Sequence, residues 1–110
     1  MYRLKFSKLY DSDVDSTYNY IKNEKESPMA AKNLINELIV KLGKIKENPR
    51  IRPLVQDEYL ASFGYRSISV KNHLIFYIIG NDNKHIKVIR FLYKKRNWMN
   101  ILKETTEEIM

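Results

Sequence analysis

Residues 65–93, YRSISVKNHLIFYIIGNDNKHIKVIRFLY, decide the fold because they predict three consecutive β-strands. Tyr65–Val70 and His85–Tyr93 largely alternate apolar with polar side chains, which is typical of strands with one buried face. Between them, His73–Ile79 is apolar at successive positions, as expected for a central strand that is buried on both faces. The short connections between the three strands predict hairpins, and therefore an antiparallel sheet.

The first turn fixes how the first two strands pair. Lys71-Asn72 is a two-residue connection, the length that is typical of tight β-hairpins. It places Arg66 opposite Tyr77, so these two side chains are expected on the same face of the sheet.

The second turn leaves two registers open. Gly80–Lys84 consists of residues that tolerate turn conformations. If all five residues form the loop, Lys87 and Tyr93 share a sheet face with Arg66. If Gly80 belongs to the strand, every later side chain changes face, and Arg90 joins Arg66 instead.

A strand and two helices are predicted before this sheet. Residues 2–6 alternate in character, and Ser7 is a plausible N-cap for a helix whose apolar residues recur until the charged run Lys22–Glu26. Ser27-Pro28 begins a second helix, which ends at Asn48-Pro49. Twenty helical residues span about 30 Å. We therefore expect a helical hairpin packed on one face of the sheet.

The remaining segments complete a single α+β domain. Residues 50–64 are expected to form a loop, and Asn97 can cap a short final helix that runs into an acidic tail. The predicted order is β-α-α-β-β-β-α, with a small and mainly antiparallel sheet. A chain of 110 residues with 44% hydrophobic content can bury one modest core, so we expect one domain over residues 1–110.

Composition excludes several classes of protein. The chain has no cysteine, which removes disulfide frameworks and thiol catalysis. Neither a signal peptide nor a membrane-spanning stretch is expected, which predicts a cytoplasmic protein. Residues 49–103 hold eleven Lys and Arg against three Asp and Glu. This basic half favours an anionic partner, although a merely solvated surface is the alternative.

Five segments together resemble one known family. They are the strand at residues 2–7, Pro53–Glu58, Tyr65-Arg66, His73–Tyr77 and Val88–Trp98. Their order and spacing are similar to those of RelE/ParE toxins from bacterial type II toxin–antitoxin systems, and they extend over nearly the whole chain. The resemblance implies a small α+β toxin that a cognate antitoxin wraps and holds inactive.

The resemblance leaves the toxin's target open. RelE-like members cut mRNA in the ribosomal A site, whereas ParE-like members poison DNA gyrase without known hydrolytic chemistry. We expect a metal-free mRNA endoribonuclease slightly ahead of a gyrase poison, and an inactive antitoxin-binding relative is a third alternative. The antitoxin should supply an acidic, amphipathic segment, because it must cover apolar surface and neutralise the basic half.

Cleavage of RNA without a metal needs a base, an acid and cations around the phosphate. Arg66 matches a basic position of RelE-like nucleases, and Arg90 stands alone in an apolar strand. Arg90 must therefore reach solvent, a phosphate, or a carboxylate such as Glu58 or Asp57. Tyr93 stands where related ribonucleases end in a catalytic tyrosine, and Glu58 is a candidate base.

Other basic residues are candidates for nucleic-acid contacts. Lys87 precedes this site on the same strand, and Lys94, Lys95 and Arg96 form a consecutive run after Tyr93. No third ligand stands at a metal-binding distance from the two histidines, so we expect neither a metal nor a cofactor.

Two positions depart from the nuclease pattern. Leu74 occupies the position of a catalytic arginine in RelE-like ribonucleases, and Leu92 occupies a position that is histidine in some relatives. Both departures weaken the prediction of an enzyme.

Overall fold

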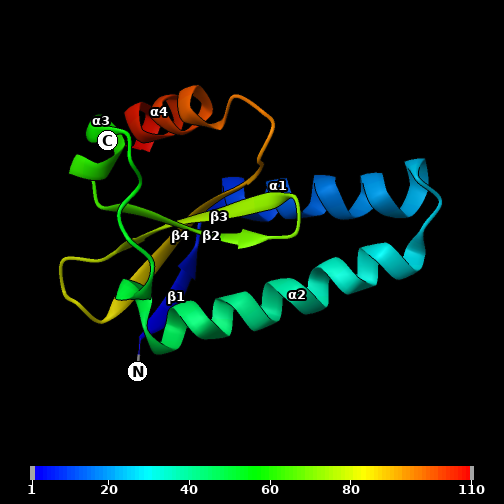
Figure 1. Ribbon diagram of the computed structural model, residues 1–110, viewed down its shortest axis with the longest axis horizontal. Helices are drawn as coiled ribbons and strands as arrows, with labels where there is room; N and C mark the ends of the chain where they lie inside the picture. Colours follow the sequence, from blue (N-terminus) through cyan, green and yellow to red (C-terminus); the bar gives the residue numbers. More distant parts are fainter. Residues whose placement is uncertain (1, 110) are drawn as a thin grey trace.

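A four-stranded sheet with helices on both faces forms the molecule in the computed structural model, which describes residues 2–109 (Figure 1). The strands are β1 (Arg3–Phe6), β2 (Tyr65–Val70), β3 (His73–Ile79) and β4 (His85–Tyr93). Their order across the sheet is β1-β4-β3-β2. β1 runs parallel to β4, and the other pairs are antiparallel. The α+β class and the mainly antiparallel sheet are thus confirmed.

The helical hairpin covers one face, which we call the hairpin face. It consists of α1 (Lys8–Asn19), a π-helical turn over Tyr20–Glu24, and α2 (Pro28–Glu47). The predicted caps are present, since Ser7 accepts a hydrogen bond from Tyr10 N and Ser27 accepts one from Ala30 N. In Figure 1 the hairpin projects beyond the end of the sheet.

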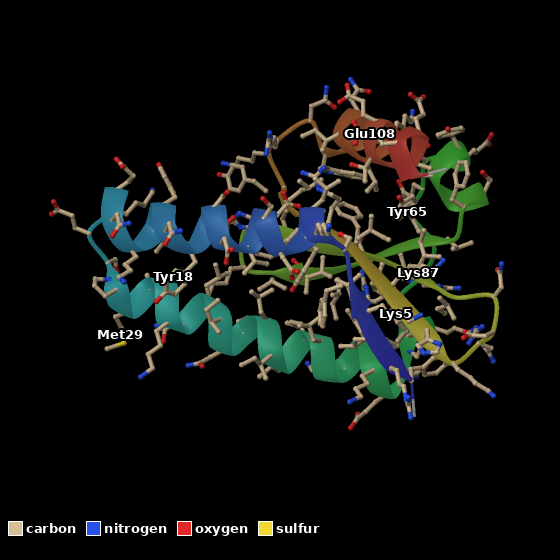
Figure 2. The ribbon with its side chains drawn as sticks, turned by 180° about the vertical axis from the view of Figure 1, so that it is seen from behind. Lys5, Tyr18, Met29, Tyr65, Lys87 and Glu108 are labelled. Atoms are coloured by element: carbon tan, nitrogen blue, oxygen red, sulfur yellow. The ribbon has the colours of Figure 1, made fainter. Side chains whose placement is uncertain are left out.

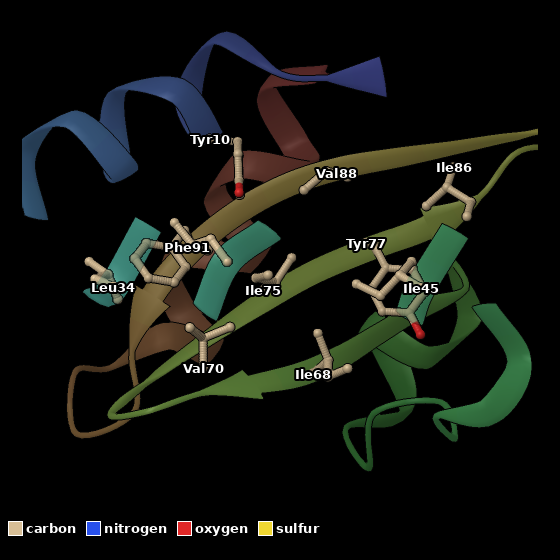
Figure 3. Packing of buried hydrophobic residues seen from close by; sticks show 11 residues of the cluster. Tyr10, Leu34, Ile45, Ile68, Val70, Ile75, Tyr77, Ile86, Val88 and Phe91 are labelled. Atoms are coloured by element: carbon tan, nitrogen blue, oxygen red, sulfur yellow. The ribbon is translucent and has the colours of Figure 1, made fainter. Parts of the chain in front are cut away.

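The hairpin face holds the larger hydrophobic cluster. Figure 3 shows side chains from the helices, such as Tyr10, Leu34 and Ile45, packed against strand residues that include Tyr77 and Val88. Tyr77 is fully buried, and its hydroxyl donates to the carbonyl of Pro49 at 2.7 Å. Burial raises the pKa of this phenol.

Two further helices cover the opposite face, which we call the α4 face. They are α3 (Glu58–Ser62) and α4 (Trp98–Ile109). The expectation of an unstructured loop over residues 50–64 is therefore wrong in part, because Asp57 caps α3 by accepting from Leu60 N at 2.9 Å. A 3-10 turn at Pro49–Ile51 also precedes that helix. The acidic tail belongs to α4, which is longer than expected.

A β-bulge in β4 resolves the register. Ile79, the last residue of β3, pairs with Ile86, and Gly80 N donates to His85 O at 2.8 Å, so hydrogen bonding between the two segments extends to Gly80. Tyr77 pairs with Val88 but Phe76 pairs with Arg90, which leaves Ile89 as one extra residue on β4. Because of this extra residue, every side chain of β4 after Ile89 points to the opposite face from the one it would have in a strand without a bulge.

Neither register predicted from the sequence holds along the whole strand. Lys87, before the bulge, pairs with Ile78 and lies on the face opposite Arg66. Tyr93, after the bulge, pairs with His73 and returns to the face of Arg66. The expectation that Arg90 would join Arg66 is wrong, because the bulge directs Arg90 to the α4 face.

No helix among residues 2–109 is long and apolar enough to cross a membrane.

Candidate functional site

Arg90 is held in a largely buried ion pair. Its Nε and Nη2 donate to the two carboxylate oxygens of Asp13 at 2.7 and 2.8 Å, and its Nη1 donates to Thr105 Oγ1 at 2.9 Å. Both charged side chains are 13% exposed. The carboxylate partner predicted from the sequence, Glu58 or Asp57, is therefore wrong. The guanidinium joins α1, β4 and α4 and has three donors already engaged within the protein.

Asp13 also completes the edge of the sheet. β1 pairs with β4 only as far as Val88, so the later part of β4 has no strand beside it. The Asp13 carboxylate accepts a hydrogen bond from Phe91 N at 3.0 Å and takes the place of that missing strand.

Arg66 lies on the edge strand β2. As predicted, it pairs with Tyr77, and its Nη1 donates to the carbonyl of Arg52. Leu54 forms an isolated bridge with Arg66 on the outer side of the strand. Arg52 in turn donates to Ser67 O at 3.1 Å, so the two arginines tie the preceding segment to β2.

Tyr93 opens into a cavity at the other end of the sheet. Its side chain is 39% exposed, and its ring centroid lies 5.3 Å from that of His73. The cavity has a volume of about 660 Å³ and lies between the projecting hairpin and the turn after β2. Its polar lining comes from Ser16, Thr17, Tyr20, Lys25, Asn72, His73 and Tyr93.

His73 forms the floor of this cavity. Its ring stacks on Phe91 with centroids 4.7 Å apart and an interplanar angle of 11°. Burial lowers the pKa of the imidazole, because desolvation disfavours its charged form. The residue is neutral at neutral pH and can donate or accept a proton through its ring nitrogens.

Arg66 and Tyr93 share a sheet face but do not form one site. Their partners on β3, Tyr77 and His73, are four residues apart, which corresponds to about 13 Å along the strand. The two residues also lie on strands that β3 separates. Helix α2 packs over this face between them, so a single phosphate could not contact both side chains.

The two residues that depart from the nuclease pattern lie side by side on the α4 face. Leu74 and Leu92 are direct cross-strand partners in β3 and β4. Leu92 is 1% exposed, and both leucines belong to the cluster formed with Trp98 and Leu102 of α4. An apolar pair beneath a helix thus replaces the reactive groups that the nuclease pattern would place here.

Glu58 belongs to α3, which covers the α4 face, whereas Arg66 and Tyr93 lie on the hairpin face. It is an exposed residue in the first turn of α3, where a negative charge favours the helix N-terminus. Its neighbour Asp57 bonds to Lys103 at 3.2 Å, and the hydrogen bond from Leu60 N lowers the pKa of the Asp57 carboxyl. Asp57 therefore links α3 to α4 through Lys103.

The remaining basic candidates lie at opposite ends of β4. Lys87 is exposed near the start of the strand, on the α4 face. Lys94, Lys95 and Arg96 are exposed in the connection between β4 and α4, beyond the end of the strand. The structure therefore does not bring the predicted site residues together in one place.

Sequence reasoning missed the roles of Asp13 and His73. Asp13 stands three residues after the buried Tyr10, on the apolar side of α1, and an acid at such a position signals a buried partner. His73 was considered only as a metal ligand, and its cavity depends on the projecting hairpin, which no local pattern predicts. Within residues 2–109 there is no cluster of three or more metal-ligating side chains.

Comparisons with known proteins agree on one group. The family model described as ParE toxin of type II toxin-antitoxin system, parDE, matches residues 4–98. A solved structure of a chromosomal ParDE system from P. aeruginosa superposes with a TM-score of 0.64 at 16% identity, over 84% of this chain and 96% of the other. The RelBE2 toxin–antitoxin complex from Mycobacterium tuberculosis gives 0.54 at 15% identity, with the same coverage of both chains. None of the curated protein sequences compared matches the chain.

Proposed function

Because the chain belongs to the ParE toxin family of type II toxin–antitoxin systems, we propose that it arrests bacterial growth as a non-hydrolytic gyrase poison. The observation that carries this proposal is the Leu74–Leu92 pair beneath α4. The position of Leu74 is a catalytic arginine in RelE-like ribonucleases and that of Leu92 is histidine in some relatives, whereas both leucines here belong to the core. Poisoning of gyrase needs no such chemistry from the toxin.

The placement of the arginines supports the same proposal. Arg90 is bound to Asp13 and Thr105, and its release toward a phosphate would leave a buried carboxylate without a partner. The β3 partners of Arg66 and Tyr93 are about 13 Å apart along that strand. Stabilisation of a phosphorane requires cations that converge on one atom, and Arg66 and Arg90 do not converge beside Tyr93.

The toxin also needs a cognate antitoxin. Both solved structures described above come from toxin–antitoxin systems, one ParDE and one RelBE2. We propose that the antitoxin of this chain carries an acidic, amphipathic segment, because the chain has a net charge of +7. Co-expression of that antitoxin should relieve the growth arrest.

One observation favours mRNA cleavage as a second candidate. His73 and Tyr93 lie side by side in the open cavity, and the exposed run Lys94–Arg96 follows directly. An imidazole and a phenol could serve as base and acid if RNA entered this cavity. The two candidates make opposite predictions for substitutions at Tyr93.

Induced expression of variants in a bacterial host tests the two candidates. Under the gyrase proposal, mRNA stays intact in cells that express the unsubstituted chain, Tyr93→Phe or Arg66→Ala. Gyrase-linked DNA breaks accumulate in the same cells. Under the second candidate, the unsubstituted chain cuts mRNA on ribosomes and Tyr93→Phe suppresses the cutting. Cleavage that Tyr93→Phe abolishes, without gyrase-linked breaks, would reject the gyrase proposal.

A further inference from the structure

Three cations lie close together on the part of the α4 face that belongs to β1 and β4. Leu4 packs against the hairpin-face cluster and Ile86 belongs to it, so the alternate residues Arg3, Lys5 and Lys87 point to the opposite side. We call these three residues the sheet patch. Figure 2 shows Lys5 and Lys87 side by side on their strands.

The strand register sets the spacing of the sheet patch. Lys5 and Lys87 are partners on adjacent parallel strands, which places their Cα atoms about 4.8 Å apart. Arg3 lies two residues before Lys5, or about 7 Å along β1. Three positive charges at this spacing repel one another, so their placement favours a bound anion.

The sheet patch is open to solvent, unlike the rest of the α4 face. Arg3, Lys5 and Lys87 are all exposed, whereas Phe76, Leu92 and their neighbours are buried beneath α3 and α4. In the part of the chain that the structure describes, none of the three cations forms an ion pair. A cavity of about 300 Å³ adjoins the patch, and Lys87 lies on its rim.

The β3–β4 loop beside the patch carries one cation, Lys84, and one carboxylate, Asp82, and Arg50 of the 3-10 turn Pro49–Ile51 is bonded to this loop. Arg50 donates to Tyr2 Oη at 2.9 Å and to Asn83 Oδ1 at 2.8 Å, which anchors its guanidinium next to the β3–β4 loop. Lys84 in that loop is exposed. The carboxylate of this loop, Asp82, is engaged with His85 at 2.5 Å and accepts from Lys84 N at 2.9 Å.

We propose that the sheet patch binds the phosphodiester backbone of duplex DNA. Duplex DNA presents regularly spaced negative charges, and lysines contact phosphates as point charges without needing a fixed approach angle. An acidic protein surface is the less suitable partner, because protein interfaces are depleted of lysine and all three residues of the patch are basic. The partner is therefore recognised by charge and not by base sequence.

This inference extends the proposed function, since a gyrase poison acts on a complex that contains DNA. The patch would hold the toxin on the DNA that gyrase has bound. Binding of DNA by the free chain nevertheless needs no gyrase, so the two proposals can fail separately.

The experiment measures the affinity of the free chain for a short duplex across a salt series. Lys5→Gln with Lys87→Gln should flatten the log–log salt slope by about 1.8, since each lost phosphate contact contributes about 0.9. Lys5→Arg with Lys87→Arg keeps both charges and should retain the original slope. Lys94→Gln with Arg96→Gln removes the same charge at the other end of β4 and should leave the slope unchanged. Circular dichroism checks that each variant is folded.

Three outcomes would overturn the proposal. They are a slope in the Lys5/Lys87 glutamine variant equal to that of the unsubstituted chain, an equal flattening in the Lys94/Arg96 variant, and competition by polyglutamate as effective as that of DNA. An unchanged slope in the Lys5/Lys87 variant would mean that DNA binds elsewhere on the chain. Equal flattening in the Lys94/Arg96 variant would mean that binding depends only on the net charge of the chain. Effective competition by polyglutamate would indicate an acidic protein as the partner. If the patch binds DNA but the chain does not trap purified gyrase on broken DNA, the proposed function is rejected and the proposed DNA binding by the patch still stands.

Discussion

At the scale of single residues, the structure engages Arg90 in an ion pair with Asp13, and we expect this pair to stabilise the fold. The sequence correctly identified Arg90 as a cation that needs a partner, because it interrupts an apolar strand. The partner could not be predicted, since Asp13 lies 77 positions away and reaches Arg90 only through the packing of α1 against β4. Long-range pairs of this kind depend on tertiary geometry and not on local pattern.

Asp13→Ala should therefore destabilise the protein strongly. The substitution leaves the Arg90 guanidinium and Phe91 N without their acceptor, and the loss of one partner of a buried pair costs about 3 kcal/mol or more. Urea denaturation measures the change in the free energy of unfolding. Asp15→Ala, at an exposed position of the same helix, is the matched control and should stay within about 0.5 kcal/mol of the original. Equal stability of the two variants would contradict the assignment.

His73 should make stability depend on pH. Burial lowers the pKa of His73 in the folded state below its value in the unfolded state. At any pH between these two pKa values, the unfolded state therefore binds more protons than the folded state. The stabilising contribution is therefore present above about pH 6.5, the unfolded pKa, and is lost as pH falls toward the folded pKa. Lys25 and Tyr93 line the same cavity, and neither supplies a negative charge to oppose this effect at acidic pH.

Thermal unfolding between pH 7.5 and 4.5 measures this dependence. His73→Phe keeps the aromatic stack on Phe91 but cannot take up a proton, so its stability should fall less over that range than that of the unsubstituted chain. If the melting temperatures of the two proteins fall equally with pH, His73 does not contribute to the pH dependence of stability.

At the scale of elements, the sequence predicted every strand, because alternation, turn residues and caps are local. Ser7, Ser27 and the Asn48-Pro49 stop act within a few residues of where they stand. The bulge at Ile89 could not be predicted, since Ile89 is an ordinary strand residue whose extra place depends on pairing with β3. That one residue decided which face carries Arg90 and Tyr93, whereas the pairing of Ile79 with Ile86 decided the face of Lys87, and the candidate site was therefore only partly predictable.

Helix α4 should depend on Leu102 for its docking. Leu102 is fully buried in the cluster with Leu92, and truncation of a buried leucine to alanine costs about 2 to 5 kcal/mol. Leu102→Ala should lower the urea midpoint accordingly, while Met99→Ala, at a residue 42% exposed, serves as the control in the same helix. If Leu102→Ala changes stability no more than Met99→Ala, α4 does not cover the sheet as described.

At the scale of the whole molecule, each face of the sheet carries a hydrophobic cluster covered by helices. The hairpin face and the covered part of the α4 face form the core, and exposed basic residues stand near the start of β4, at Lys87, and beyond its end, at Lys94–Arg96. The resemblance carried by five short segments correctly predicted this architecture and the toxin family. It did not determine the target, because that depends on which side chains converge after the bulge.

Purified gyrase with ATP and supercoiled plasmid gives the most direct test of the central claim, with translating ribosomes on mRNA assayed in parallel. We predict that the purified chain converts plasmid to protein-linked linear DNA and that its cognate antitoxin prevents the conversion. The mRNA should remain intact on the ribosomes. Ribosomal mRNA cleaved by the chain, together with plasmid that gyrase leaves unbroken, would contradict the account.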